Sequence, residues 1–460
     1  MKTKLSGGKI IAFDGNRHIL LEKGEIVFQG DQIIFVGEFY GEKVDRTIDT
    51  SSKLILPGFI NIHTHSLSAS LLYRGILEDE SSALYKYLLP IRYGTNSRPP
   101  YASGEDAYYL SRVVLLEVLK SGVTTVLEQT NNLEDVLQIA RALGIRIYGC
   151  HSYFSGMPFE EGGRVVYPKF KDSCPALDEN LRLIKAYQNL EGGRIKVWLG
   201  PHAPDTCSTE LLCETRRKAT ELKVGISTHV AQSPTEDGEM QRRAQKTPVE
   251  FLDDLRFWGP DVIAAHAIHT TPNDEEIMAR SGMTVVHCAS SYLKNGVRAP
   301  MARYRKRGIN VVLGTDQNAM DFLGEMRLAM FSSKLNENDA MATTCLDILN
   351  AVTLNAAKAL GRDDIGRIYP GVKADFTQIN LRQPHLTPSR DPLKTLLYHA
   401  GPGDVDTVIV GGQIVMAEGK ILTVDEEEII AKADEVARRL WAKADCEVGL
   451  PRLLIDRWRS

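Results

Sequence analysis

The stretch Leu56-Pro57-Gly58-Phe59-Ile60-Asn61-Ile62-His63-Thr64-His65 is an apolar run that ends in two histidines separated by one residue. Residues two apart in a β-strand face the same side, so His63 and His65 are expected to point in one direction. Imidazole is a preferred protein ligand for zinc and related divalent ions. The stretch therefore predicts a buried strand whose end presents a candidate pair of metal ligands.

Apolar, strand-like runs recur through the middle of the chain, and most are followed by a helical pattern. They lie at Leu54–Ile62, Val123–Leu127, Ile145–Tyr148, Ile195–Leu199, Val224–Thr228, Val262–Ala265, Thr284–Val286 and Asn310–Leu313. Helices are expected at Gly104–Lys120, Leu133–Leu143, Glu210–Leu222 and Asp274–Ser281. This alternation predicts an α/β fold with a (β/α)8 TIM-like barrel.

Four further polar residues follow strands of this predicted barrel. They are His202, His229, His266 and Asp316, after the fourth, fifth, sixth and eighth runs. The active sites of such barrels lie at the carboxyl ends of the strands. These residues are therefore expected to share one site with the two histidines of the first strand.

Both ends of the chain have the alternation and turn residues of short β-strands. The expected strands are Lys9–Phe13, Gly24–Gly30, Gln32–Gly37, Gly371–Phe376, Val405–Val410 and Gly411–Met416. We expect them to form one small β-sandwich domain from residues 1–55 and 369–424, with the barrel at 56–368 and a C-terminal helical extension at 425–460. An amphipathic helix at Asp425–Ala444 is expected to pack on the outside of the fold or on a neighbouring subunit, and the long segment Ser66–Ser103 to form a lid.

Bulk composition excludes several classes of function. The formal net charge is −4, with 55 basic and 59 acidic residues interspersed, which argues against a nucleic-acid-binding protein. No stretch approaches the roughly 20 apolar residues of a membrane helix. The seven cysteines are irregularly spaced and contain no CxxC pair, which fits a reducing compartment. We expect a cytoplasmic protein that acts on a small molecule and forms a homo-oligomer.

The motifs at the strand ends resemble those of the amidohydrolase superfamily. The resemblance rests on PGFINIHTH, Ser227-Thr228-His229, Ala264-Ala265-His266, Leu313-Gly314-Thr315-Asp316 and Pro370-Gly371-Val372-Lys373-Ala374-Asp375, and it covers about residues 8 to 425. It implies a metal held by His63, His65, His229 and Asp316. Non-catalytic relatives of the superfamily typically lose metal ligands, whereas this chain keeps all four.

The resemblance is strongest to the branch that contains nucleoside-thioether deaminases and triazine hydrolases. It is carried there by Gly200-Pro201-His202-Ala203-Pro204, Thr206-Cys207-Ser208, His287, Ser290-Ser291-Tyr292-Leu293-Lys294-Asn295-Gly296 and Glu325-Met326-Arg327. It implies that Asp316 moves the proton of the attacking water and that His266 either polarises the electrophile or hydrogen-bonds the attacking hydroxide. Contacts to the substrate are expected from His202, His287, Gln317 and Asn318.

The number of metal ions follows from the fourth strand. Superfamily members with two metals use a carboxylated lysine at the end of that strand, but Lys196 lies inside it and His202 occupies its end. This favours one divalent ion held by three histidines and one aspartate. Zinc is the default for this ligand set, and iron, cobalt and manganese are also compatible with it.

Gln232 departs from the pattern of the deaminases, which carry a glutamate three residues after the fifth-strand histidine. That glutamate moves a proton to a ring nitrogen, which an amide cannot do, and Glu236 lies four residues further on. We therefore count Gln232 among the catalytic residues and expect hydrolysis of an amide-, urea- or carbamate-like C–N bond, as in phenylurea and thiocarbamate hydrolases. The alternative is an aminohydrolase that acts on an aminated N-heterocycle.

Overall fold

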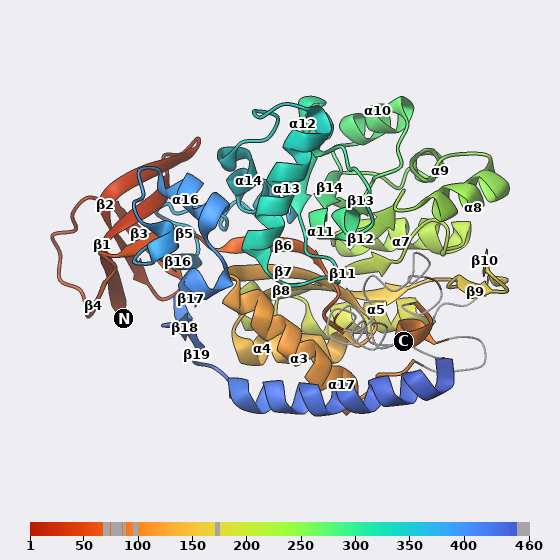
Figure 1. Cartoon of the computed structure of the whole chain (residues 1–460), viewed down its shortest axis with the longest axis horizontal. Helices are drawn as coiled ribbons and strands as arrows, with labels where there is room; N and C mark the ends of the chain where they lie inside the picture. The colour runs from red at the N-terminus through yellow and green to blue at the C-terminus, as the bar shows by residue number, and fades with distance from the viewer. Residues whose placement is uncertain (68–73, 75–84, 86–88, 95–99, 171–174, 449–460) are drawn as a thin grey trace, which may run out of the picture.

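The computed structural model describes residues 1–67, 74, 85, 89–94, 100–170 and 175–448. Its main body is a sheet of eight parallel strands in the order β15-β14-β13-β12-β11-β8-β7-β6 (Figure 1). A single bridge between Thr64 and Asp316 joins the two outer strands, so that the barrel nearly closes. These strands are β6 (Phe59–Thr64), β7 (Val123–Thr130), β8 (Arg146–Tyr153), β11 (Ile195–Pro201), β12 (Ile226–Val230), β13 (Val262–His266), β14 (Thr284–His287) and β15 (Asn310–Leu313).

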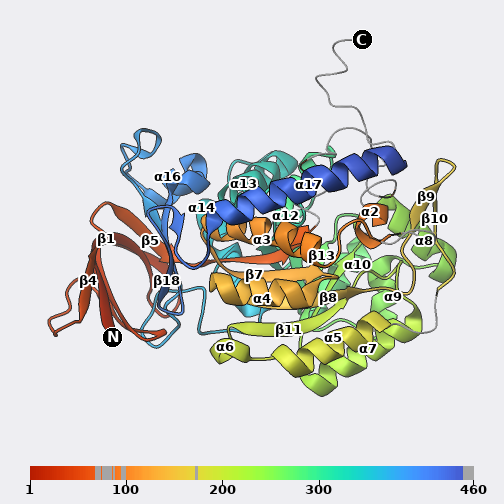
Figure 2. The same ribbon diagram turned by 90° about the horizontal axis from the view of Figure 1, so that it is seen from below.

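Helices lie between the strands and cover the outside of the barrel (Figure 2). They are α2 (Leu89–Tyr93), α3 (Glu105–Lys120), α4 (Leu133–Leu143), α5 (Pro175–Tyr187), α6 (Leu190–Gly193), α7 (Thr209–Leu222), α8 (Pro234–Ala244), α9 (Pro248–Asp254), α10 (Pro272–Ser281), α11 (Ala289–Leu293), α12 (Met301–Lys306), α13 (Phe322–Glu337), α14 (Cys345–Ala351) and α15 (Leu354–Ala359). Local sequence fixes several of their ends. Capping boxes begin α9, α10 and α14, and Gly144 ends α4 with a φ of 81°. The (β/α)8 prediction is confirmed.

The strands at the two chain ends form a separate sheet, as predicted. They are β1 (Lys2–Phe13), β2 (His18–Gln29), β3 (Gln32–Gly37), β4 (Arg46–Asp49), β5 (Lys53–Pro57), β16 (Phe376–Asn380), β17 (Val405–Val410), β18 (Gln413–Ala417) and β19 (Lys420–Ile421). Two 3-10 turns (Pro384–Leu386 and Pro402–Asp404) and α16 (Pro392–His399) lie between β16 and β17. We propose that the domain bounds follow this division, near residues 55, 368 and 424.

Two predicted strands were wrong in their bounds. The run 54–62 is two strands in different sheets, because β5 belongs to the chain-end sheet and β6 to the barrel. The break falls at Gly58, where a Cβ would lie 2.2 Å from the Thr124 hydroxyl, so only glycine fits. The strand expected at 371–376 begins only at Phe376, because Gly371, with a φ of 93°, belongs to a turn.

Helix α17 (Glu426–Val448) packs against α3, as Figures 1 and 2 both show. Its buried residues Val436, Ala437, Leu440 and Ala444 form a cluster with residues of α3 and with Leu67, Ile91 and Tyr101. The prediction that this helix packs on the outside of the fold is confirmed. Most of the predicted lid 66–103, and residues 449–460 of the extension, lie outside the described residues.

A buried ion pair joins the barrel to the chain-end sheet. The Arg146 guanidinium, at the start of β8, donates to both carboxylate oxygens of Asp375 at 3.0–3.1 Å, and each side chain is 3% exposed. Asp375 Oδ1 also accepts from the backbone amide of Gly411 at 2.6 Å. Removing the carboxylate therefore leaves the Arg146 guanidinium and the Gly411 amide without their acceptor.

We expect Asp375→Ala to lower the free energy of unfolding by about 3 kcal/mol, because it leaves the Arg146 charge buried without a partner. Denaturant unfolding of the two proteins measures this difference. The control is Asp434→Ala, which removes an exposed pair with Arg438 on α17 and should change stability by less than about 0.5 kcal/mol. Equal changes in the free energy of unfolding for the two variants would show that the buried pair does not stabilise the contact between the barrel and the chain-end sheet.

The described residues contain no helix long and apolar enough to cross a membrane. Cys150, Cys207, Cys213, Cys288, Cys345 and Cys446 are free thiols, and Cys174 lies outside the described residues.

Candidate metal centre and substrate cavity

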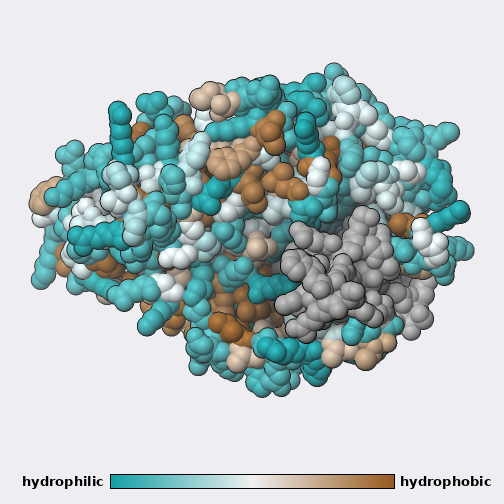
Figure 3. Space-filling view, viewed as in Figure 1, coloured by the Kyte–Doolittle hydropathy of each residue, from teal (hydrophilic) through white to brown (hydrophobic). Residues whose placement is uncertain are grey.

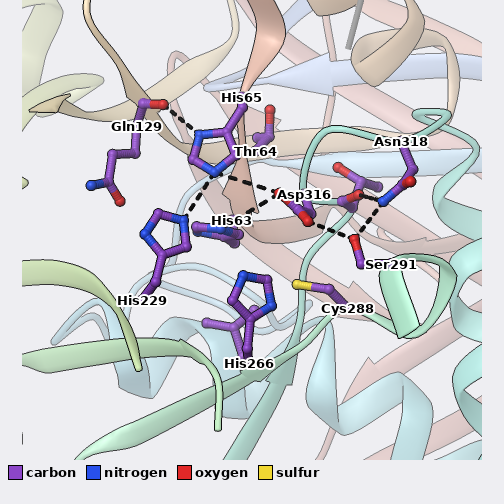
Figure 4. A network of polar contacts seen from close by, with 12 residues as sticks. His63, Thr64, His65, Gln129, His229, His266, Cys288, Ser291, Asp316 and Asn318 are labelled. Carbon is purple, nitrogen blue, oxygen red and sulfur yellow. Dashed lines mark hydrogen bonds and ion pairs between the residues drawn. The ribbon is translucent and has the colours of Figure 1, made fainter. Parts of the chain in front are cut away.

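The four predicted metal ligands come together at the carboxyl end of the barrel (Figure 4). His63 lies in β6 and His65 directly follows it, while His229 lies in β12 and Asp316 just after β15. His65 Nε2 lies 3.1 Å from His229 Nε2 and 3.5 Å from Asp316 Oδ1, and His63 Nε2 lies 3.9 Å from the same oxygen. All four side chains are buried.

Hydrogen bonds to backbone carbonyls fix the tautomers of two of these histidines. His65 Nδ1 donates to the Gln129 carbonyl at 2.6 Å, and His229 Nδ1 donates to the His202 carbonyl at 2.7 Å. A carbonyl can only accept, so both Nε2 atoms carry lone pairs in the neutral rings. Burial lowers the pKa of both histidines, to about 3 for His229, and keeps the rings neutral.

This arrangement fits a divalent cation. The two Nε2 atoms lie 3.1 Å apart, and their lone pairs repel each other unless a positive ion lies between them. Both ring nitrogens of His63 are buried and have no hydrogen-bond partner among the described residues. Histidine ligands held by carbonyl groups are the usual construction of protein metal sites.

Backbone strain marks two of the predicted catalytic residues. His266 has a φ of 79° and Asp316 a φ of 56°, values that residues other than glycine rarely adopt. Such conformations cost about 1–3 kcal/mol each and concentrate at functional sites. The His266 ring stacks on His229 with the centroids 5.4 Å apart, and Tyr292 Oη lies 3.4 Å from His266 Nδ1.

A chain of hydrogen bonds holds the carboxylate of Asp316. Ser291 Oγ donates to Asp316 Oδ2 at 2.5 Å, Asn318 Nδ2 donates to Ser291 Oγ at 2.6 Å, and Lys294 Nζ donates to Asn318 Oδ1 at 2.6 Å. Oδ1 is thereby directed to the histidines. Burial lowers the pKa of Lys294 to about 8.

A cavity opens in front of these residues. Five predicted substrate-contacting or catalytic residues line it: His202, Gln232, His266, Asp316 and Gln317. Asn318 and His287 are not part of its lining. Asn318 instead belongs to the hydrogen-bond chain of Asp316, and the buried His287 ring packs edge-on against Tyr292 at 5.2 Å. The full lining is His65, Tyr85, Leu89, Arg92, Pro158, His202, Asp205, Thr206, His229, Gln232, His266, Ile268, Ser291, Tyr292, Lys294, Asn295, Val297, Asp316 and Gln317.

Glu236 does not take the place of the missing glutamate at position 232. It is fully buried, and its two carboxylate oxygens accept from the backbone amides of Ala231 and Gln232 at 2.9 and 2.8 Å. It therefore shapes the loop after β12, and it is not part of the cavity lining.

Sequence reasoning missed several residues of the site. Arg92 lies buried in the cavity wall and donates to the Gln129 carbonyl at 3.0 Å. No motif in the neighbouring sequence indicates that Arg92 belongs to the site. Ser291 and Lys294 belong to a motif that carried the family resemblance, but only the structure assigns them to the support of Asp316. Asp205 also lines the cavity.

A family model described as the amidohydrolase family matches residues 54–415. The chain belongs to this family. A 5'-deoxyadenosine deaminase of Methanosarcina mazei is 33% identical over 433 residues, which cover 92% of this chain and 95% of the relative. A 5-methylthioadenosine/S-adenosylhomocysteine deaminase of Desulfitobacterium hafniense is 35% identical over 429 residues, 90% and 94% of the two chains.

Solved structures agree with this assignment. A triazine hydrolase variant superposes with a TM-score of 0.86 at 25% identity, covering 95% of this chain and 99% of that one. An adenosine deaminase from Xanthomonas campestris with bound zinc also gives a TM-score of 0.86, at 22% identity and with 96% and 98% coverage, and supports the fold. This amidohydrolase is a metal-dependent enzyme for carbon–nitrogen bonds other than peptide bonds, and its homologues act on small molecules.

Proposed function

We propose that this amidohydrolase is a deaminase that releases ammonia from an aminated N-heterocycle of the adenine type. The observation that carries the proposal is the similarity, over at least nine-tenths of both chains, to relatives named as deaminases of adenine nucleosides. The assembled residues His63, His65, His229 and Asp316 are consistent with it. This was the alternative from the sequence, and it now has more support than the amide, urea or carbamate hydrolase that Gln232 favoured.

In the proposed reaction, water attacks the ring carbon that carries the amino group. A divalent ion in such a site lowers the pKa of a bound water and makes it a nucleophile near neutral pH. Asp316 accepts a proton from the attacking water and passes it to the leaving nitrogen. Neutral His266, whose pKa is lowered by burial, hydrogen-bonds the attacked group from the cavity wall.

We propose a single zinc ion as the metal. Lys196, which sits at the start of β11 rather than at its end, donates to Asn189 Oδ1 at 2.7 Å and is not part of this cavity. No lysine of β11 is therefore available to bridge a second ion. Three histidines and one aspartate suit zinc, and a neighbouring solved structure is described with bound zinc.

We propose that the chain forms a homo-oligomer through an apolar surface on α13. Leu328, Phe331 and Leu335 share one face of this helix and are 40%, 42% and 70% exposed. Figure 3 shows apolar side chains gathered over this part of the molecule. In multi-angle light scattering we expect a species larger than 51.1 kDa that Leu335→Lys shifts toward the monomer, and a purely monomeric wild type would contradict the proposal.

The proposed activity is tested by measuring kcat/KM across two substrate classes with the zinc-loaded enzyme. One class contains adenosine, 5'-deoxyadenosine and 5'-methylthioadenosine and is followed by ammonia release. The other contains phenylureas, anilides and carbamates and is followed by amine release. We expect at least one nucleoside to reach about 10⁴ M⁻¹s⁻¹. Amine release alone would replace this proposal by the second candidate, an amide-, urea- or carbamate-type hydrolase.

Gln232 supplies a sharper prediction within the same reaction. Gln232→Glu places a carboxyl group in the cavity wall, where it can protonate a ring nitrogen, and should raise kcat for deamination about 10- to 100-fold. Gln317→Glu, the same change at another lining glutamine, is the control and should give no such gain. If both variants behave alike, position 232 does not determine proton transfer to the substrate.

A further inference from the structure

Asp205 lies in the loop after β11 and has a buried carboxylate oxygen without a partner. Its side chain lines the cavity and is only 2% exposed. Tyr167 Oη donates to Oδ2 at 2.7 Å, but Oδ1 has no hydrogen-bond partner among the described residues. Asp205 and Asp316 are the only two carboxylates that line the cavity in the described structure.

A purely structural role does not account for this oxygen. Buried polar groups normally find hydrogen-bond partners, and a buried carboxylate oxygen without one is costly. Arg243, which lies within electrostatic reach, does not supply one, because its guanidinium donates to the backbone carbonyls of Pro204, Asp205 and Cys207. The protein thus fixes the backbone of this loop while one carboxylate oxygen stays available.

The surroundings define which ligand suits Asp205. Among the described residues Oδ2 accepts from Tyr167 and Oδ1 has no partner, so a single donor on the substrate is enough to satisfy this carboxylate. The Arg243 guanidinium and the Glu239 carboxylate both lie within electrostatic reach of Asp205 and act on its pKa in opposite directions. The charge of the ionised Asp205 carboxylate itself favours a cationic donor over a neutral one. Burial raises the pKa of Asp205 to about 6, which still leaves it largely ionised above neutral pH.

We propose that Asp205 is a specificity-determining residue that accepts one hydrogen bond from a hydroxyl or, better, an ammonium group on a part of the substrate that does not react. Among the described residues, the Asp205 side chain accepts from Tyr167 and contacts none of the four candidate metal ligands, so we infer that it faces a part of the substrate away from the attacked carbon. In its nucleoside form, this inference rests on the proposed deaminase function.

The experiment compares kcat/KM for analogues that share the adenine ring and differ in one donor. 5'-Deoxyadenosine, adenosine and 5'-amino-5'-deoxyadenosine carry a methyl, a hydroxyl and an ammonium group at one position, and 2',3'-dideoxyadenosine lacks the ring hydroxyls of adenosine. We expect the wild-type kcat/KM to be about 10- to 100-fold higher for the analogue that carries the recognised donor than for the analogue that lacks it.

Two substitutions separate charge from hydrogen bonding. Asp205→Asn keeps an acceptor but removes the charge, so it should abolish a preference for the ammonium and largely preserve one for a hydroxyl. Asp205→Ala should abolish both preferences. Asp237→Asn is the matched control, because Asp237 also has a buried oxygen without a partner among the described residues but is not part of the cavity lining.

Each outcome is decisive. A preference that is lost in the Asp205 variants and kept in Asp237→Asn, with unchanged metal content, supports the assignment. A wild type that shows no preference, or Asp205 variants that slow all analogues equally, would overturn it while leaving the deaminase proposal intact. If the wild type releases ammonia from none of these nucleosides, the deaminase proposal fails and the nucleoside form of this inference fails with it.

Discussion

Asp316→Asn is expected to lower kcat at least about a thousandfold while the protein stays folded, because the substitution changes the proposed metal ligand and removes the proposed proton carrier. The Asp316 carboxylate directs Oδ1 to the histidines and has Oδ2 held by Ser291. An asparagine of the same shape keeps the packing but cannot take up a proton. Steady-state kinetics, metal analysis and thermal unfolding of the purified variant test this expectation.

Asp321→Asn is a suitable control for this substitution. Asp321 caps α13 by accepting from the backbone amide of Gly324 at 2.7 Å, and asparagine is an equally good cap. We expect near-normal turnover and stability in this variant. A kcat above about one-tenth of the wild-type value in Asp316→Asn would exclude Asp316 as the proton carrier.

Removing the metal is expected to abolish turnover and to lower the melting temperature. The lone pairs of His65 Nε2 and His229 Nε2 face each other at 3.1 Å in a buried site, so the folded chain loses a favourable interaction when no cation is present. A ligand that binds only the folded state stabilises it by about 3–4 kcal/mol at concentrations of 100 to 1,000 times its Kd. Calorimetry before and after chelation, with zinc added back, measures this contribution.

Re-addition of zinc should restore both activity and melting temperature in the wild type. In His229→Ala, re-added zinc should raise activity and melting temperature far less, because this variant lacks one of the Nε2 lone pairs proposed to bind the metal. An enzyme that keeps full activity and the same melting temperature after exhaustive chelation would show that these histidines do not hold a functional metal.

The sequence predicted the parts of this structure that depend on short-range pattern. All eight barrel strands and the four candidate ligands were located, because buried parallel strands are apolar and a barrel brings their ends together. The bounds of β5 and β6 were missed because the change of sheet depends on the approach of Thr124 to Gly58, which lies far away in the sequence.

The inner wall of the site was less predictable. The backbone carbonyls of Gln129 and His202 fix two histidine tautomers. Every residue has such a carbonyl, so the amino-acid sequence does not indicate which ones accept from a histidine. Arg92 and Asp205 come from an excursion and a loop whose course is set by tertiary contacts. The expected roles of Asn318 and His287 as substrate contacts stay predictions, since the cavity lining contains neither side chain.

The most direct measurement of the central claim is the fate of 5'-deoxyadenosine incubated with the zinc-loaded enzyme in ¹⁸O-labelled water. We expect one ammonia per substrate consumed, and mass spectrometry should find one ¹⁸O atom on the ring carbon that carried the amino group. Asp316→Asn should give neither product. The absence of ammonia from this and every other aminated heterocycle, beside rapid hydrolysis of a phenylurea or an amide, would contradict the claim that this amidohydrolase is a deaminase.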